Sequence, residues 1–210
     1  MASPEMQATE PTRRARRRAE VSQRVLDAAE ALFCARGYDE TTVAEICDAA
    51  DVAYGTFFNH FPAKSDLLRA MGDRAVAEIS AGLQALESES LGIEEVLELF
   101  FERFAERLET VSAGERALAA RVQALAFTDP SEHRDQGFHA AFEAFLRRAI
   151  ESGGVRKDLP AETLADLVSS TFASMSLSWV HVDGFPVRAR AIALARVLGE
   201  TLCPRATGTG

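Results

Sequence analysis

Residues 42–64 read TVAEICDAADVAYGTFFNHFPAK, a string that fits two short helices separated by a tight turn. Thr42 and Glu45 stand in the S/T-x-x-E relation of a capping box, which predicts a helix over residues 42–49. A second helix is predicted over residues 53–61, because a proline follows and disfavours helical geometry in the residue before it. Two helices joined in this way are typical of the helix-turn-helix unit, whose second helix enters the major groove of DNA.

The remaining chain is predicted to be all-α. Apolar residues recur with the helical period in almost every segment, and the alternation typical of strands is absent. A first helix is predicted over about 18–36 and is closed by Gly37. Longer helices are expected at about 65–86, 92–111, 115–127, 131–152, 160–179 and 186–202. These elements predict a basic arm at 1–17, a helix-turn-helix domain at 18–64, a larger helical domain at 65–203 and a tail at 204–210.

The charge distribution points to one cationic segment in an acidic protein. The formal net charge of −9 argues against a protein that coats nucleic acid through bulk electrostatics. Five arginines nevertheless cluster near the start of the chain, at Arg13, Arg14, Arg16, Arg17 and Arg18. This cluster is either an arm that contacts phosphate or enters a minor groove, or a solubilising tail, and the sequence leaves both open.

The residue pattern favours a binding protein over an enzyme. No nucleophile with its base, phosphate loop or metal-ligand spacing stands out, and we expect no catalytic residue, metal or cofactor. Three cysteines without a disulfide framework suit a reducing cytoplasm, and we expect neither a secretory signal nor a membrane span. A redox sensor built on Cys34 or Cys47 is a weaker alternative, since both lie on stretches expected to be packed.

The string RVLDAAEALFCARGYDE at residues 24–40, followed by TTVAEICDAADVAYGTFFNHFPAKSDLL at residues 41–68, resembles the DNA-binding region of the TetR family of transcriptional regulators. The resemblance implies a homodimeric repressor that binds a near-palindromic operator of double-stranded DNA. It also implies that a small molecule binds the domain at 65–203, alters the helix at 65–86 and releases the DNA. The same domain in the family forms the dimer.

The resemblance also assigns roles within the helix-turn-helix. The family's positions that match Tyr54, Gly55 and Thr56 approach base edges, and those that match Thr42, Asn59, His60 and Lys64 contact phosphate. The apolar side that should hold the two helices against the first one consists of Ile46, Ala50, Val52, Phe57 and Phe61. Ala53, the first residue of the predicted second helix, completes the set. The predicted DNA-binding residues are Thr42, Ala53, Tyr54, Gly55, Thr56, Asn59, His60 and Lys64.

Three residues depart from the family pattern. Asp51 stands where the family usually has glycine, and an aspartate tolerates a left-handed backbone only at some cost. Ala53 replaces a serine or threonine cap, a loss of typically ~1 kcal/mol in helix stability. Phe58 replaces a tyrosine and removes one hydroxyl that would bind phosphate. The arginine cluster would then have to supply some of the missing phosphate contacts.

The larger domain is unusually rich in aromatic residues, which suggests an apolar or aromatic effector. The predicted effector pocket is Phe100, Phe104, Arg121, Phe127, Phe142, Phe172, Met175 and Trp179. Gln123, His139 and His181 are further polar candidates. At helical spacing, however, most of these aromatic residues fit an ordinary core equally well. The segments 160–179 and 186–202 look like the family's dimerisation pair, with a predicted interface of Leu164, Val168, Phe172, Ile192, Val197 and Leu198.

Overall fold

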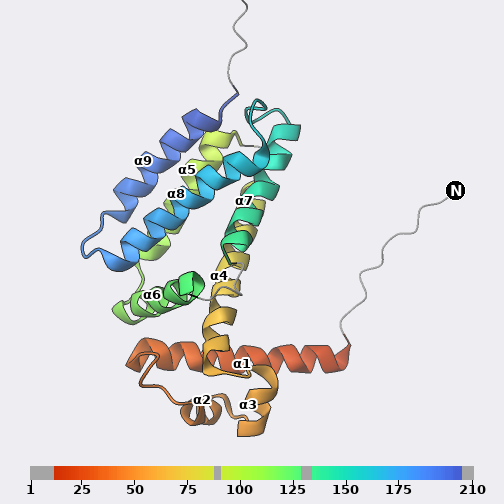
Figure 1. Cartoon of the computed structure of the whole chain (residues 1–210), viewed down its shortest axis with the longest axis vertical. Coiled ribbons are helices and arrows are strands. Elements are labelled where there is room, and N and C mark those ends of the chain that lie inside the picture. Colours follow the sequence, from red (N-terminus) through yellow and green to blue (C-terminus); the bar gives the residue numbers. More distant parts are fainter. Residues whose placement is uncertain (1–11, 88–90, 129–133, 205–210) are drawn as a thin grey trace, which may run out of the picture. The chain divides into compact units, whose positions relative to one another are not determined.

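The computed structural model describes residues 12–87, 91–128 and 134–204, and the regular secondary structure of these residues consists of α-helices joined by turns and loops (Figure 1). The predicted all-α class is therefore confirmed. The chain divides into two compact units, residues 1–67 and 68–210. None of the described helices is long and apolar enough to cross a membrane.

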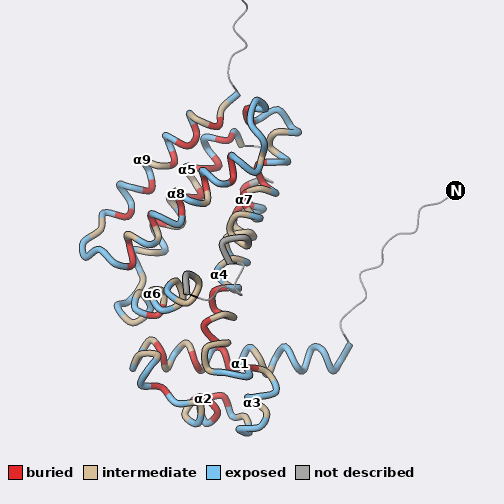
Figure 2. Tube along the Cα trace, viewed as in Figure 1, coloured by how far each residue is buried: buried red, intermediate tan, exposed pale blue. Residues whose placement is uncertain are grey.

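The first unit contains α1 (Arg13–Arg36), α2 (Val43–Ala50), α3 (Tyr54–His60) and the first turn of α4 (Lys64–Glu87). Each helix buries one apolar side: Val25, Leu26, Ala29 and Phe33 from α1, Ile46, Cys47 and Ala50 from α2, and Phe57 from α3 (Figure 2). The predicted core residue Val52 is only partly buried. This small core fixes the α2–α3 pair against α1.

The helix α1 begins five residues earlier than the sequence predicts. Thr12 caps it, because its hydroxyl oxygen accepts a hydrogen bond from the amide of Ala15 at 3.3 Å. The arginine cluster therefore lies inside a helix rather than in an arm before it. At the other end, Gly37 adopts a φ of 93°, a region that side chains with a Cβ rarely enter, and so ends the helix as predicted.

The turn between α2 and α3 has the geometry that the sequence predicts. Asp51 has φ 52° and ψ 54°, and it is the one non-glycine residue with positive φ in the described part of the chain. Its amide donates to the carbonyl oxygen of Asp48 at 3.3 Å. Ala53 precedes α3 without any side-chain cap, as expected for a residue that lacks a hydroxyl.

The second unit contains the rest of α4 with α5 (Ile93–Glu109), α6 (Ala113–Thr128), α7 (Arg134–Glu151), α8 (Ala161–His181) and α9 (Val187–Leu202). Figure 1 shows α5, α8 and α9 side by side. Helices α5 and α9 approach each other closely, since a Cβ on Gly199 would lie 2.9 Å from the Cγ of Glu94. In the core of this unit the ring of Phe172 contacts five others, those of Phe100, Phe101, Phe104, Phe138 and Phe142.

Candidate nucleic-acid interface

The amino end of α3 presents the predicted base-reading residues to solvent. Tyr54 is 57% exposed and Gly55 is exposed beside it, whereas Phe57 is fully buried. Thr56 is partly exposed. A Cβ on Gly55 would meet no atom within 4 Å, so this position leaves open space next to the helix axis. A double helix could thus approach the backbone of α3 closely at this point.

An aromatic pair borders this surface. The rings of Tyr54 and Phe58 meet edge to face with centroids 5.0 Å apart, and Phe58 is 38% exposed. Their contact gives the Tyr54 ring a defined position without burying its hydroxyl. Asn59 lies further along the helix and is also exposed. A side chain held in this way is suited to base-edge recognition, since little conformational freedom is lost on binding.

Thr42 lies at the start of α2 in the predicted capping box. Its hydroxyl donates to Oε2 of Glu45 at 2.8 Å and accepts from the Glu45 amide at 3.3 Å, while its own amide donates to the same carboxylate at 2.8 Å. These bonds from Thr42 hold the pKa of Glu45 below its ordinary value, with help from Arg36 at 2.7 Å. The anion at this helix end is therefore the protein's own carboxylate.

Lys64 is held by the protein itself. Its ammonium group donates to the carbonyl oxygens of Tyr38 and Thr41 at 2.8 and 2.9 Å, and it lies 4.2 Å from the centre of the Tyr38 ring. The sequence predicts only a phosphate contact here. In the structure Lys64 fastens the loop between α1 and α2 to the start of α4.

The carboxyl end of α3 is tied to α1. Nδ1 of His60 lies 2.7 Å from Oγ of Ser22, and Nη2 of Arg18 donates to the carbonyl oxygen of Asn59 at 3.4 Å. Sequence reasoning missed Arg18 as an individual site residue. Its only signal there was membership of the arginine cluster.

Several of the predicted effector residues are buried in the core of the second unit. Phe100, Phe142, Phe172 and Met175 are at most 6% exposed, so they pack against one another, and their place in an effector pocket stays a prediction. Phe104 is partly exposed against the same rings, and Arg121 is exposed. The side chain of Phe127 lies outside the described residues. Aromatic side chains at helical spacing satisfy one another by packing, so composition alone does not reveal a cavity.

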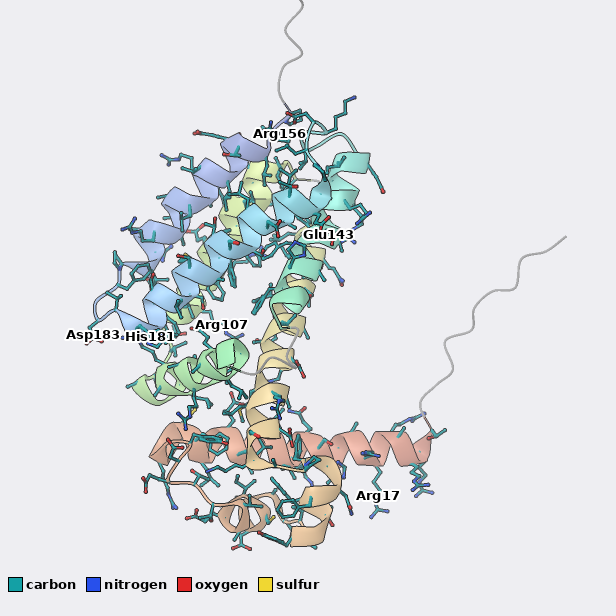
Figure 3. All side chains as sticks on the ribbon, viewed as in Figure 1. Arg17, Arg107, Glu143, Arg156, His181 and Asp183 are labelled. Carbon is teal, nitrogen blue, oxygen red and sulfur yellow. The ribbon has the colours of Figure 1, made fainter. Side chains whose placement is uncertain are left out.

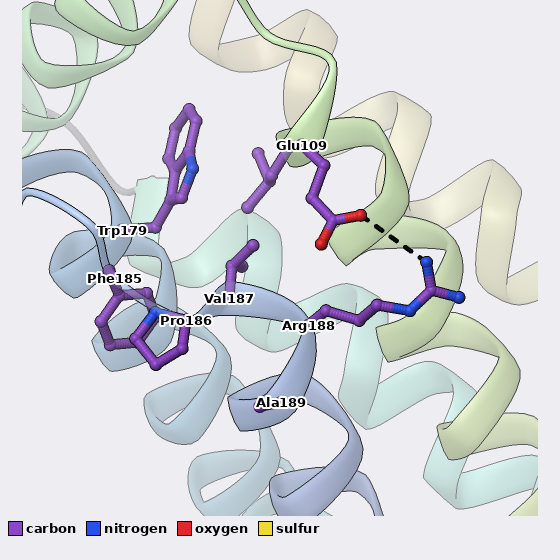
Figure 4. Close-up of a pocket in the computed structure, with 8 residues that line it drawn as sticks. Glu109, Trp179, Phe185, Pro186, Val187, Arg188 and Ala189 are labelled. Atoms are coloured by element: carbon purple, nitrogen blue, oxygen red, sulfur yellow. Dashed lines mark ion pairs between the residues drawn. The ribbon is translucent and has the colours of Figure 1, made fainter.

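Trp179, one of the predicted effector residues, borders an open pocket of about 360 Å³ (Figure 4). This pocket lies where the end of α5 meets the start of α9 and the segment before it. Its other lining residues are Leu108, Glu109, Phe185, Pro186, Val187, Arg188 and Ala189. Arg188 pairs with Glu109 at 3.6 Å across its edge.

The polar candidates in the second unit have different surroundings. Nε2 of Gln123 donates to Oγ of Ser176 at 2.9 Å, but its buried Oε1 has no hydrogen-bond partner among the described residues. His139 lies 3.0 Å from a carboxylate oxygen of Asp166, and His181 is exposed. A buried acceptor without a donor is unfavourable, so Gln123 has unused capacity to bind a ligand.

The residues of the predicted dimer interface differ strongly in exposure, and the interface itself stays a prediction. Leu164, Val168, Phe172 and Leu198 are at most 3% exposed because they pack into the chain's own core, which leaves almost none of their surface for a partner. Ile192 and Val197 are 41% and 59% exposed on α9. An apolar pattern on a helix does not distinguish the side that packs internally from the side that meets another subunit.

Cys34, Cys47 and Cys203 all lie in the part of the chain that the structure describes, and all three are free thiols. No cluster of three or more His, Cys, Asp or Glu residues there could hold a metal ion. Cys47 is buried, and burial together with Asp48 raises the pKa of its thiol, which disfavours the reactive thiolate.

Comparisons with known proteins agree with this geometry. Residues 25–71 match the family described as bacterial regulatory proteins, tetR family. The chain is 25% identical over 162 residues to the HTH-type transcriptional repressor DhaR of Mycobacterium sp. (strain GP1), a match that covers 74% of this chain and 80% of DhaR. These relatives are transcriptional regulators rather than enzymes.

Solved structures share the fold over nearly the whole chain. The TetR family transcriptional repressor FadR of Thermus thermophilus, in complex with lauroyl-CoA, superposes with a TM-score of 0.69 at 26% identity, covering 90% of this chain and 98% of that one. FadR of Bacillus subtilis, in complex with stearoyl-CoA, gives 0.64 at 21% identity, covering 86% and 98%.

Proposed function

We propose that this chain, which is a TetR-family transcriptional regulator, represses transcription by binding a near-palindromic operator as a homodimer and leaves it when a small-molecule effector binds. The observation that carries the proposal is the exposed amino end of α3, where Tyr54 and Gly55 are exposed, Thr56 is partly exposed and Phe57 is buried beneath them. A helix-turn-helix uses this end of its second helix to contact base edges.

The roles at this surface follow from side-chain chemistry. The Thr56 hydroxyl and methyl suit a base edge or the methyl group of thymine, and the Tyr54 hydroxyl can donate or accept in the groove. Gly55 allows the backbone to come close. Thr42, Asn59, His60 and Lys64 would hold the duplex through phosphates, as the family resemblance implies. The side chains of Thr42, His60 and Lys64 already bond to protein groups, so their contribution to phosphate binding is limited.

The proposed dimer surface consists of the exposed apolar residues of α8 and α9. Leu167 and Leu177 of α8 are 41% and 37% exposed, and Ile192 and Val197 of α9 continue the set. A single short recognition helix reads few base pairs, whereas a twofold dimer reads two half-sites. We therefore assign the interface to these outward residues in place of the buried ones that the sequence predicts.

The proposed effector site is in the second unit, and an apolar ligand suits it best. The structural relatives bind acyl-CoA molecules, whose chains are apolar. In this chain the rings around Phe172 fill the centre of the unit, so a ligand there would have to separate them. Because α4 runs from the first unit into the second, binding energy that favours the opened state could shift its position and lower the affinity for DNA.

Band-shift titration tests the DNA-binding proposal, with the region upstream of the chain's own coding sequence and duplexes selected from a random library as probes. Tyr54→Ala should change sequence preference and weaken the best duplex by about 1–3 kcal/mol, whereas Tyr54→Phe should keep the ring contacts. Thr163→Ala, on an exposed position of α8, is the control. Unchanged binding by Tyr54→Ala and by Thr56→Ala together would refute the assigned surface.

A further inference from the structure

The first turns of α1 form a charged helix that the core does not need. Residues 12–20 are all exposed, and five of the six positions from 13 to 18 are arginines. The cap at Thr12 gives this segment a defined start. A helix that extends beyond its core and carries mainly one charge presents a surface for a partner of opposite charge.

Helical spacing divides these arginines between two sides of α1. At 3.6 residues per turn, Arg14 and Arg18 share a side with Ser22, and Arg17 lies beside Arg14 at the edge of that side. Arg13 and Arg16 lie on the opposite side. We call Arg14, Arg17 and Arg18 the arginine stripe.

The side that carries the arginine stripe is directed toward α3. Arg18 donates to the carbonyl oxygen of Asn59, and Ser22 contacts His60 at 2.7 Å. Figure 3 shows Arg17 projecting from α1 on the side where α2 and α3 lie. The stripe thus extends the surface of the recognition helix along α1.

The rest of the first unit does not provide the positive charge that DNA binding requires. Residues 19–67 contain nine acidic and three basic side chains, a net of −6. Of the three basic residues, Arg36 pairs with Glu45 at 2.7 Å and Lys64 donates to two carbonyl oxygens. Without the arginine cluster, this unit would repel a phosphate backbone at long range.

The helix dipole disfavours the arginines in the first turn of α1 unless an anion is bound beside them. The amino end of α1 is the positive end of the dipole, and its first turn contains arginines and no acidic residue. A bound phosphate would reverse this penalty, because it would neutralise both the guanidinium groups and the helix end.

We propose that the arginine stripe binds the phosphate backbone of operator DNA beside the groove that α3 enters, and that it supplies the principal phosphate contacts of each chain. This inference rests on the proposed function, since it requires that α3 reads DNA. Of the two interpretations that the sequence leaves open, the proposal favours a phosphate contact over a solubilising tail, and it places that contact on a structured helix.

Two matched pairs of substitutions in the full-length protein test the proposal. Arg14→Ala with Arg18→Ala removes two charges from the stripe, and Arg13→Ala with Arg16→Ala removes two from the opposite side of the same helix. Alanine favours helix, so both variants should keep α1, which circular dichroism can verify. Affinity for a duplex selected with the wild-type protein is measured by fluorescence anisotropy over a series of salt concentrations.

The stripe variant should reduce the slope of log affinity against log salt by about two per bound chain, because each lost phosphate contact contributes about 0.9. The opposite pair should change it by less than half as much. Base preference should stay unchanged in both, since phosphate contacts carry no sequence information. Equal slopes for the two pairs, no change in either, or an altered base preference would each overturn the proposal. Failure of the wild-type protein to bind any duplex would instead reject the proposed function.

Discussion

The ammonium nitrogen of Lys64 lies 4.2 Å from the centre of the Tyr38 ring and donates to the Tyr38 carbonyl oxygen at 2.8 Å. A second bond, to the carbonyl oxygen of Thr41, joins the same loop at 2.9 Å. Thr41 itself is buried and its hydroxyl donates to the Gly37 carbonyl oxygen. One lysine thus stabilises the whole loop between α1 and α2, a role separate from any contact with DNA.

Replacement of Lys64 should therefore destabilise the fold. Lys64→Ala leaves two carbonyl oxygens without their donor, and we expect a loss of ~1–3 kcal/mol in the free energy of unfolding. Urea unfolding followed by circular dichroism measures it, with Lys157→Ala, an exposed lysine of the second unit, as the control. An unchanged urea midpoint together with lost DNA affinity would show that Lys64 acts mainly on phosphate.

Asp51→Gly should stabilise the first unit. Asp51 adopts the left-handed conformation, which disfavours residues with a Cβ by about 1 kcal/mol, and glycine removes this penalty at a smaller cost in chain entropy. We expect a gain of roughly 0.5 kcal/mol in thermal or urea unfolding. The same change at Asp48, inside α2, should destabilise by a few tenths of a kcal/mol. A loss of stability in Asp51→Gly would mean that the aspartate side chain itself contributes to the turn.

These two positions show what the sequence can and cannot predict. The turn at Asp51 and the capping box at Thr42 depend on residues within a few positions of each other, so local patterns are sufficient. The bond between Lys64 and Tyr38 joins residues 26 positions apart, and no local pattern reveals it. The early start of α1 differs from the predicted one: arginines in the first turn of a helix are unfavourable, but Thr12 caps the helix before them.

In the second unit, the sequence predicts where the helices lie but not which side of each helix is buried. Helix positions and lengths followed from apolar periodicity, yet Val168 and Ile192 looked equivalent as apolar residues of neighbouring helices. Val168 is fully buried in the chain and Ile192 is 41% exposed. Only the packing of α5, α7, α8 and α9 decides which side of each helix is internal.

Glu45 makes the stability of the first unit depend on pH. Its pKa is lowered by hydrogen bonds from Thr42, so the charged form is favoured in the folded state. This contribution is present above the ordinary glutamate pKa of about 4.3 and is lost as the pH falls through the lowered value. Glu45→Gln keeps the shape but not the charge. Thermal midpoints of the wild type and Glu45→Gln should differ at neutral pH and converge in acid.

The exposed Glu40→Gln removes the same charge outside the capping box and serves as the control. If the thermal midpoint of the wild type stays above that of Glu45→Gln by the same amount down to about pH 2, this role of the carboxylate is contradicted.

If α9 lies in the dimer interface, a charged residue introduced on its exposed apolar surface should disrupt the dimer. Val197→Asp should convert the dimer to monomers at micromolar concentration in light scattering, because it buries an unpaired carboxylate in an apolar interface. Val182→Asp, at a position 50% exposed in the segment after α8, is the control and should leave the dimer intact. Leu198→Ala should instead lower stability by ~2–5 kcal/mol, since Leu198 is a core residue. A monomeric wild-type protein would contradict the homodimer itself.

Gln123 provides a test of effector recognition that is separate from the aromatic core. Its buried Oε1 lacks a donor among the described residues, so a ligand hydroxyl placed there would gain a hydrogen bond at little cost. Gln123→Met loses the bond to Ser176 but also removes the unpaired oxygen, and we expect the thermal midpoint of the ligand-free protein to change little.

The distinguishing measurement is a thermal-shift comparison of aromatic compounds that carry hydroxyl groups with their methyl ethers, for example resorcinol and 1,3-dimethoxybenzene. In the wild type, hydroxyl compounds that bind should stabilise more than their ethers, and Gln123→Met should abolish this difference, because methionine offers only a weak acceptor. Gln84→Met, at an exposed position of α4, should preserve it. The same preference for hydroxyl compounds in Gln123→Met would place their recognition at another residue.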